Sequence, residues 1–135
     1  MKVSANRRIA AQQAQDCMTI LARLARKSNT DPAPFRGAAR SMLGMSEGGF
    51  LSRYEVNSYQ EHFARLAATE TSAKRATLYR QARNVCKALA DTPNNPALCY
   101  ALAFDAVERA TEAIQPASAQ MLLRVLEKKT AARFI

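Results

Sequence analysis

Apolar residues recur every three or four positions along most of the chain, and this period is typical of amphipathic α-helices. In residues 5–27, for instance, Ile20, Leu21 and Leu24 fall on one helical face while the arginines fall on others. No run of alternating β-branched or aromatic residues bounded by turn signals indicates a strand. We therefore expect an all-α fold of five to six helices.

Prolines and helix-capping residues divide this pattern into segments. Two prolines in the 28–34 stretch should end the first helix, and Gly44 should end the second in left-handed geometry. Asn95 and Pro96 are expected to cap and to begin a later helix. The expected helices span residues 5–27, 35–43, 51–68, 73–89, 96–115 and a last stretch from 116 onward.

A chain of 135 residues is long enough to form one domain with a core of its own. Its N-terminus lacks the apolar stretch of a secretory signal, and no segment has the roughly 18 to 20 continuous apolar residues of a membrane span. We expect a cytoplasmic protein that does not associate with membranes. Cys17, Cys86 and Cys99 are far apart and lie in apolar helical phases, which favours buried reduced thiols over disulfides.

Positive charge is confined to the first two-thirds of the chain. Residues 1–90 contain fifteen Lys or Arg and six Asp or Glu, whereas residues 91–135 contain five of each, so the whole formal charge of +9 belongs to residues 1–90. An excess of this size attracts polyanions, of which nucleic acid is the commonest. A generally soluble basic surface is the alternative. We expect one domain over residues 1–135, with a basic part at 1–90 and a neutral helical hairpin at 91–135.

A local motif lies at residues 39–55, with the sequence ARSMLGMSEGGFLSRYE. It resembles the helix-turn-helix of repressor-like transcriptional regulators, in which a Leu-Gly-apolar-Ser turn separates a support helix from a recognition helix. The resemblance implies a turn at Gly44, a helix capped by Ser46 and polar side chains that reach into the major groove. The sequence departs from the helix-turn-helix pattern in two ways. One extra residue precedes the LSRY string, and the pair Gly48-Gly49 would weaken a recognition helix by roughly 1 kcal/mol per glycine. A glycine-containing connection between two core helices is the alternative.

A looser similarity extends over more of the N-terminal part. An apolar helix with Ile20 and Leu24, then Phe35, then the MLGMSE string at residues 42–47, is similar to the small subunit of the flagellar master transcription activator. That family is all-α and dimeric, and it acts on promoter DNA with a second subunit. The resemblance implies a transcriptional regulator and leaves the last forty-five residues without a counterpart.

A second basic surface is expected on the helix predicted for residues 73–89. Positions 80, 83 and 87 share a helical face, so their side chains can contact successive phosphates, although a solvated helix face is the alternative. Such contacts fix the position of a protein on DNA without reading bases. The candidate nucleic-acid-binding residues of the whole chain are Arg36, Arg40, Ser46, Glu47, Ser52, Arg53, Lys74, Arg75, Arg80, Arg83 and Lys87.

The C-terminal hairpin is a candidate dimerisation element. Its last helix carries more large apolar residues than a solvent-facing terminal helix needs, namely Met121, Leu122, Val125 and Leu126. A homodimer is the expected state, and packing of the hairpin on its own domain is the alternative.

Little in the sequence indicates catalysis, a cofactor or a metal. The chain has one histidine, His62, its acids are scattered singly, and Gly48-Gly49 lacks the Lys and Ser or Thr of a P-loop. Without paired cysteines a zinc site is not expected. The sequence thus predicts a non-enzymatic regulator of phage or plasmid type that binds double-stranded DNA. The alternatives are a helical adaptor or inhibitor that binds an acidic host protein, and an RNA-binding protein.

Overall fold

The computed structural model describes residues 5–116, which form five α-helices and no strand. The helices are α1 Ala5–Lys27, α2 Ala33–Gly48, α3 Arg53–Thr69, α4 Ala73–Asp91 and α5 Pro96–Ile114. The expected all-α class is confirmed. The predicted bounds of the first and fifth helices agree with α1 and α5, whereas α2 and α4 are longer than the sequence predicts.

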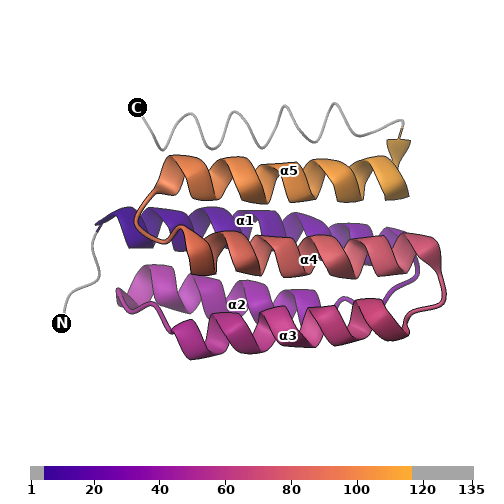
Figure 1. Cartoon of the computed structure of the whole chain (residues 1–135), viewed down its shortest axis with the longest axis horizontal. Coiled ribbons are helices and arrows are strands. Elements are labelled where there is room, and N and C mark those ends of the chain that lie inside the picture. Colours follow the sequence, from indigo (N-terminus) through magenta and orange to yellow (C-terminus); the bar gives the residue numbers. More distant parts are fainter. Residues whose placement is uncertain (1–4, 117–135) are drawn as a thin grey trace.

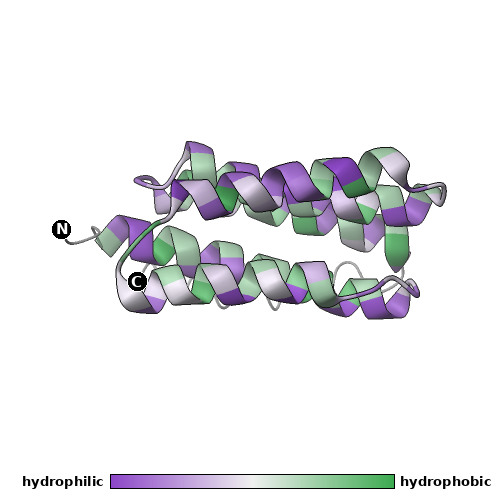
Figure 2. Ribbon diagram, turned by 90° about the horizontal axis from the view of Figure 1, so that it is seen from below, coloured by the Kyte–Doolittle hydropathy of each residue, from purple (hydrophilic) through white to green (hydrophobic). Residues whose placement is uncertain are grey.

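The helices form two antiparallel hairpins, α1 with α2 and α3 with α4, stacked as two layers (Figure 1). The fifth helix packs against both α1 and α4 and so closes one side of the bundle. The axes of the five helices are nearly parallel or antiparallel to one another (Figure 1). Hydrophilic and hydrophobic residues alternate along each helix (Figure 2), as expected where one face is buried and the other is solvated.

One hydrophobic core extends through the five helices. An aromatic group joins three of them, because the ring of Phe35 in α2 lies 5.2 Å from that of Phe63 in α3 and 5.6 Å from that of Tyr79 in α4. Further along the bundle, α1 contributes Met18 and Leu21, which are fully buried. Short connections pair α1 with α2, α3 with α4 and α4 with α5, whereas α2 and α3 are also joined by a short connection but contact each other little.

The predicted end of the second helix at Gly44 is wrong. Helix α2 continues to Gly48, and the glycine with left-handed geometry is Gly49, with φ of 69°. The reason is that Met45 continues the buried stripe of α2, whereas Gly44 lies on the exposed side with no neighbour near its missing side chain. A glycine in an exposed helical position costs only about 1 kcal/mol relative to alanine, which the buried stripe offsets.

The cap predicted at Ser46 is wrong for the same reason, because this residue lies inside α2. The N-cap of α3 is Ser52, whose hydroxyl oxygen accepts a hydrogen bond of 3.2 Å from the backbone N–H of Glu55. The predicted cap at Asn95 is confirmed, since its side-chain oxygen accepts from the backbone N–H of Leu98 at 3.1 Å. The connection between α2 and α3 therefore lies at residues 49–52, several residues after the position that the helix-turn-helix pattern implies.

The three cysteines are buried free thiols, as the sequence predicts. Helix α5, the first helix of the predicted C-terminal hairpin, buries Cys99, Ala103 and Val107 in the core of the same chain. The predicted dimerisation residues Met121, Leu122, Val125 and Leu126 lie outside the described residues.

Candidate functional site

The predicted basic residues do not form one continuous surface. Arg36 and Arg40 lie on α2, in the layer that α2 forms with α1, whereas Lys74, Arg75, Arg80, Arg83 and Lys87 lie on α4 in the other layer (Figure 1). Arg53 begins α3 at the end of the α2–α3 connection. The structure thus divides the candidate residues between two layers of the bundle.

The α4 cations are partly engaged within the protein. Lys87 forms an ion pair with Asp91 at 2.7 Å, one turn further along the helix. The Arg83 side chain is half-buried and donates a hydrogen bond to the side-chain oxygen of Asn84 at 3.0 Å. Arg80 is exposed and donates to the hydroxyl of Thr77 at 3.1 Å. The cations at positions 80, 83 and 87 therefore each have a partner on α4 itself, and their contact with phosphates stays a prediction.

The predicted base-reading residues have different environments. The hydroxyl of Ser46 donates a hydrogen bond of 3.3 Å to the side-chain oxygen of Gln12 and so links α2 to α1. Ser52 is occupied as the cap of α3, as described above. Glu47 and Arg53 are exposed. Two of the four candidates for base contacts therefore have a role in holding the fold.

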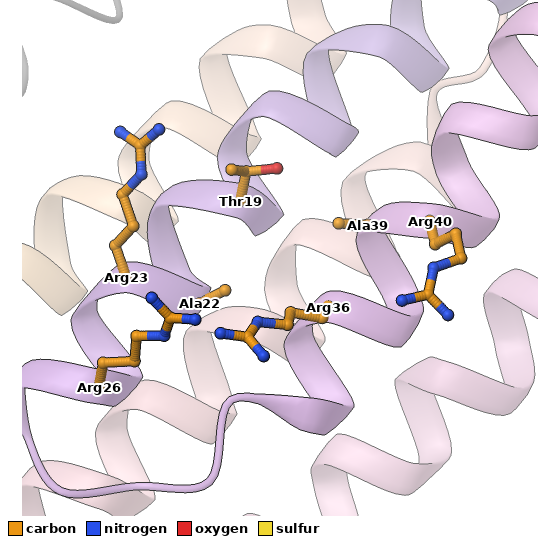
Figure 3. A pocket seen from close by; sticks show the side chains of 7 residues that line it. All are labelled: Thr19, Ala22, Arg23, Arg26, Arg36, Ala39 and Arg40. Atoms are coloured by element: carbon orange, nitrogen blue, oxygen red, sulfur yellow. The ribbon is translucent and has the colours of Figure 1, made fainter.

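A different cluster of cations lies between α1 and α2. Four arginines line a surface hollow of about 250 Å³, which we call the arginine hollow. Its lining residues are Thr19, Ala22, Arg23, Arg26, Arg36, Ala39 and Arg40. Arg26 of α1 and Arg36 of α2 extend their guanidinium groups toward one another across the hollow, while Arg23 and Arg40 point away from that pair (Figure 3).

The local sequence explains why this hollow forms. Ala22 and Ala39 are buried where α1 meets α2, and their short side chains leave space below the longer side chains around them. Arg23 and Arg26 are three residues apart on α1, and Arg36 and Arg40 are four apart on α2, so each pair lies on one helical face. Pairing of the two helices brings the two faces together, so that four arginine side chains surround the hollow and the two alanines lie at its base.

In the part of the chain that the structure describes, the four arginines have no carboxylate partners. All four are exposed, and within residues 5–116 none forms an ion pair or a hydrogen bond with Asp or Glu. By contrast, Lys87 on α4 and Arg109 on α5 are each paired with an acid one turn away. Like charges that face one another without a counterion repel, so the arginine hollow favours an anion between Arg26 and Arg36.

A groove between α2 and α3 adjoins the arginine hollow. It has a volume of about 540 Å³, and its lining residues are Gly37, Arg40, Ser41, Tyr54, Glu55, Ser58 and Tyr59. Arg40 lines both the hollow and this α2–α3 groove. The hydroxyl of Ser41 donates a hydrogen bond of 2.5 Å to the carboxylate of Glu55 and so joins the two helices.

Sequence reasoning found Arg36 and Arg40 but missed Arg23, Arg26 and Tyr54. The spacing of Arg23 and Arg26 places them on one face of a helix, which is visible in the sequence. Their juxtaposition with Arg36 depends on how α1 pairs with α2, and no local pattern carries that information.

The residues that could support nucleophilic chemistry are in unfavourable surroundings for it. Burial raises the pKa of the Cys86 thiol to about 12 and that of Cys99 to about 11, so both thiols are neutral at physiological pH. His62 is exposed on α3 beside Phe63, with ring centroids 6.1 Å apart. Within residues 5–116, no group of three or more His, Cys, Asp or Glu is arranged to hold a metal ion.

Residues 5–116 form a bundle of five helices that presents an arginine-lined hollow on its α1–α2 layer. None of the five helices is long and apolar enough to cross a membrane. No protein-family model, curated protein or solved structure matches this chain.

Proposed function

We propose that this chain is a non-enzymatic nucleic-acid-binding protein that holds the phosphate backbone at the arginine hollow. The observation that carries the proposal is the set of four arginines on one surface that have no carboxylate partner within residues 5–116. Arginine presents a planar fork of N–H donors that matches two phosphate oxygens, and each contact releases counterions from the nucleic acid. The excess of +9 over residues 1–90 adds a long-range attraction for the same ligand.

Regulation of transcription at double-stranded DNA is the form of this function that the sequence favours. It requires base contacts in addition to phosphate contacts. Glu47 and Arg53 are exposed and available for such contacts, whereas Ser46 and Ser52 already bond within the fold. The geometry therefore supports backbone binding more strongly than base readout.

The test is fluorescence anisotropy of a labelled duplex and of its separated strands, titrated with protein at several salt concentrations. The variant Arg26→Gln/Arg36→Gln removes two positive charges from the hollow. We expect it to bind more weakly and to flatten the plot of log affinity against log salt by about 1.8 for duplex DNA, at about 0.9 for each lost phosphate contact.

A matched control removes the same net charge elsewhere. The variant Lys74→Gln/Arg80→Gln neutralises two exposed cations of α4 and should change the salt slope much less. Equal effects of the two double variants would show that binding follows total charge and does not involve the hollow. Wild-type protein that binds neither nucleic acid at about 50 mM salt, where electrostatic binding is favoured, would contradict the proposal.

The second candidate function is a protein-interaction module, and one observation favours it. Leu98 and Leu102 are one turn apart on α5, and each leaves 45% of its surface exposed. A pull-down from lysate with and without nuclease separates the two candidates. Partners that survive nuclease treatment and are lost on Leu98→Ser/Leu102→Ser would favour the interaction module, and partners lost on nuclease treatment alone would favour nucleic-acid binding.

A further inference from the structure

Two aromatic side chains near the start of α3 are exposed to solvent, and one of them, Tyr54, lines the α2–α3 groove. Tyr54, the second residue of α3, leaves 82% of its surface exposed, and Phe50, in the connection before α3, leaves 68% exposed. In the described part of the chain these are the two most exposed of the large apolar side chains. Removal of an exposed aromatic ring from water on binding is favourable, so two such rings near the start of α3 indicate a surface that binds a ligand.

The α2–α3 groove is large enough for an organic group. Its volume of about 540 Å³ lies within the range of roughly 300 to 1,000 Å³ that is usual for small-molecule sites, whereas the arginine hollow, at about 250 Å³, lies below that range. Tyr54 and Tyr59 contribute phenol rings to the lining of the groove. The smaller hollow therefore suits a compact anion, and the larger groove suits a planar ring.

The charged residues of the two sites also favour a phosphate in the arginine hollow and a base in the α2–α3 groove. The arginine hollow contains four cations and no acid among its lining residues, whereas the α2–α3 groove contains the carboxylate of Glu55. That carboxylate accepts one hydrogen bond from Ser41 and retains capacity for others. It repels phosphate and accepts from N–H groups, which the edges of nucleobases supply.

Arg40 connects the two sites, because it lines both of them. A nucleotide whose phosphate lies in the arginine hollow can therefore extend its base into the neighbouring groove. In a duplex this is prevented, since each base is paired and stacked on its neighbours. An unpaired base is free to stack on an exposed aromatic ring.

We infer that the preferred ligand is single-stranded nucleic acid, with phosphates in the arginine hollow and an unpaired base stacked on Tyr54 in the α2–α3 groove. This inference rests on the proposed function and adds the strand state of the ligand. It departs from the sequence-based expectation of double-stranded DNA. The sequence has no recognisable stacking motif and predicts few exposed aromatic residues, but it does not show which of them are exposed beside the arginines.

The experiment compares four labelled probes of about twelve nucleotides, a length within the usual range for single-strand sites. They are oligo(dT), oligo(U), a duplex of matched length, and an abasic deoxyribose-phosphate strand that has the backbone without bases. Each is titrated with the wild-type protein, Tyr54→Ala and Tyr54→Phe. Because Tyr54 is exposed, neither substitution is expected to disturb folding, and circular dichroism and thermal unfolding check this for each variant.

We expect the wild-type protein to bind oligo(dT) or oligo(U) more tightly than the duplex and the abasic strand. Tyr54→Ala should weaken binding of the base-bearing single strand by about 5- to 150-fold, the usual effect of removing one stacking partner, and should leave abasic-strand binding nearly unchanged. Tyr54→Phe should restore the affinity, because the ring rather than the hydroxyl makes the contact. Comparison of oligo(dT) with oligo(U) shows whether DNA or RNA is preferred.

The inference is overturned if the duplex binds more tightly than the single strands, or if Tyr54→Ala binds base-bearing and abasic strands as the wild type does. If Arg26→Gln/Arg36→Gln nevertheless weakens the binding of every probe, the result supports backbone binding at the hollow without base stacking. If the wild-type protein binds none of the four probes, the proposed function and this inference both fail. If Tyr54→Ala also abolishes binding of the abasic strand, stacking is contradicted, because that strand has no base.

Discussion

The ring of Phe35 in α2 lies nearly parallel to the ring of Tyr79 in α4, with centroids 5.6 Å apart and an interplanar angle of 9°. Phe35 is fully buried and also contacts Phe63 of α3. A single side chain of the first hairpin therefore packs against both helices of the second. This contact fixes the relative position of the two layers that carry the arginine hollow and the α2–α3 groove.

Replacement of Phe35 by alanine should lower the free energy of unfolding by about 3 to 5 kcal/mol, because it removes a buried ring and leaves a cavity. Chemical denaturation followed by circular dichroism measures the change. Phe50→Ala is the matched control, since the same substitution at an exposed ring should alter stability by no more than about 0.5 kcal/mol. Similar losses at both positions would contradict the described packing.

Two glycines close together in the sequence should respond to alanine in opposite directions. Gly44→Ala should stabilise the protein by about 1 kcal/mol, because this exposed position lies inside α2 with open space around it. Gly49→Ala should destabilise it by about 1 to 2 kcal/mol, because Gly49 has φ of 69°. The added methyl group at Gly49 would also displace the guanidinium of Arg8.

Thermal or urea unfolding of the two glycine variants decides where α2 ends. A destabilised Gly44→Ala together with an unaffected Gly49→Ala would place the turn at Gly44, as the helix-turn-helix resemblance implies. The opposite result supports the longer helix.

Inorganic pyrophosphate should stabilise the wild-type protein, because an anion between Arg26 and Arg36 removes the repulsion of the facing guanidinium groups. At about ten times its Kd, a ligand that binds only the folded state adds about 1.4 kcal/mol to the free energy of unfolding. Urea denaturation with and without pyrophosphate, at matched ionic strength, measures this effect. Arg36→Gln should lose most of it, while its stability without ligand stays within about 0.5 kcal/mol of the wild type. If pyrophosphate stabilises both proteins equally, it acts outside the hollow.

Stability should fall in alkaline solution, and part of the fall should come from Cys86. Its pKa is about 12 in the folded protein, because of burial, against 9.0 for an ordinary thiol. Between these two values the unfolded thiol releases its proton while the folded thiol keeps it. The unfolded state then binds fewer protons, so the contribution of Cys86 to stability is complete below pH 9 and declines by about 1.4 kcal/mol per pH unit above it.

Unfolding free energies of the wild type and Cys86→Ala, measured from neutral pH to about pH 11, test this contribution. Subtraction of the two curves removes the effect of the other titrating groups, including Cys99, whose pKa is also raised. The difference between the proteins should be constant below pH 9 and should shrink above it. A difference that does not change with pH would show that Cys86 ionises as readily in the folded protein as in the unfolded chain.

The sequence by itself determines the fold class, most helix bounds and the distribution of charge. Three- and four-residue spacing of apolar positions and the Asn95-Pro96 cap act over a few neighbouring residues, so they can be read without knowledge of the packing. The confinement of the excess charge to residues 1–90 is a property of composition alone. These features account for the all-α class and for the expectation of a polyanionic ligand.

Tertiary structure alone decides which cations meet and where α2 ends. The arginine hollow exists because α1 pairs with α2 in a register that places Arg26 opposite Arg36, and that register depends on the shape of the whole core. The same packing extends α2 past Gly44, because burial of Met45 outweighs the local preference of glycine for a turn. Because of the same packing, Tyr54 and Arg40 line one groove, whereas the cations of α4 lie in the other layer. Contacts between residues far apart in the sequence carry these outcomes, and a local pattern does not encode them.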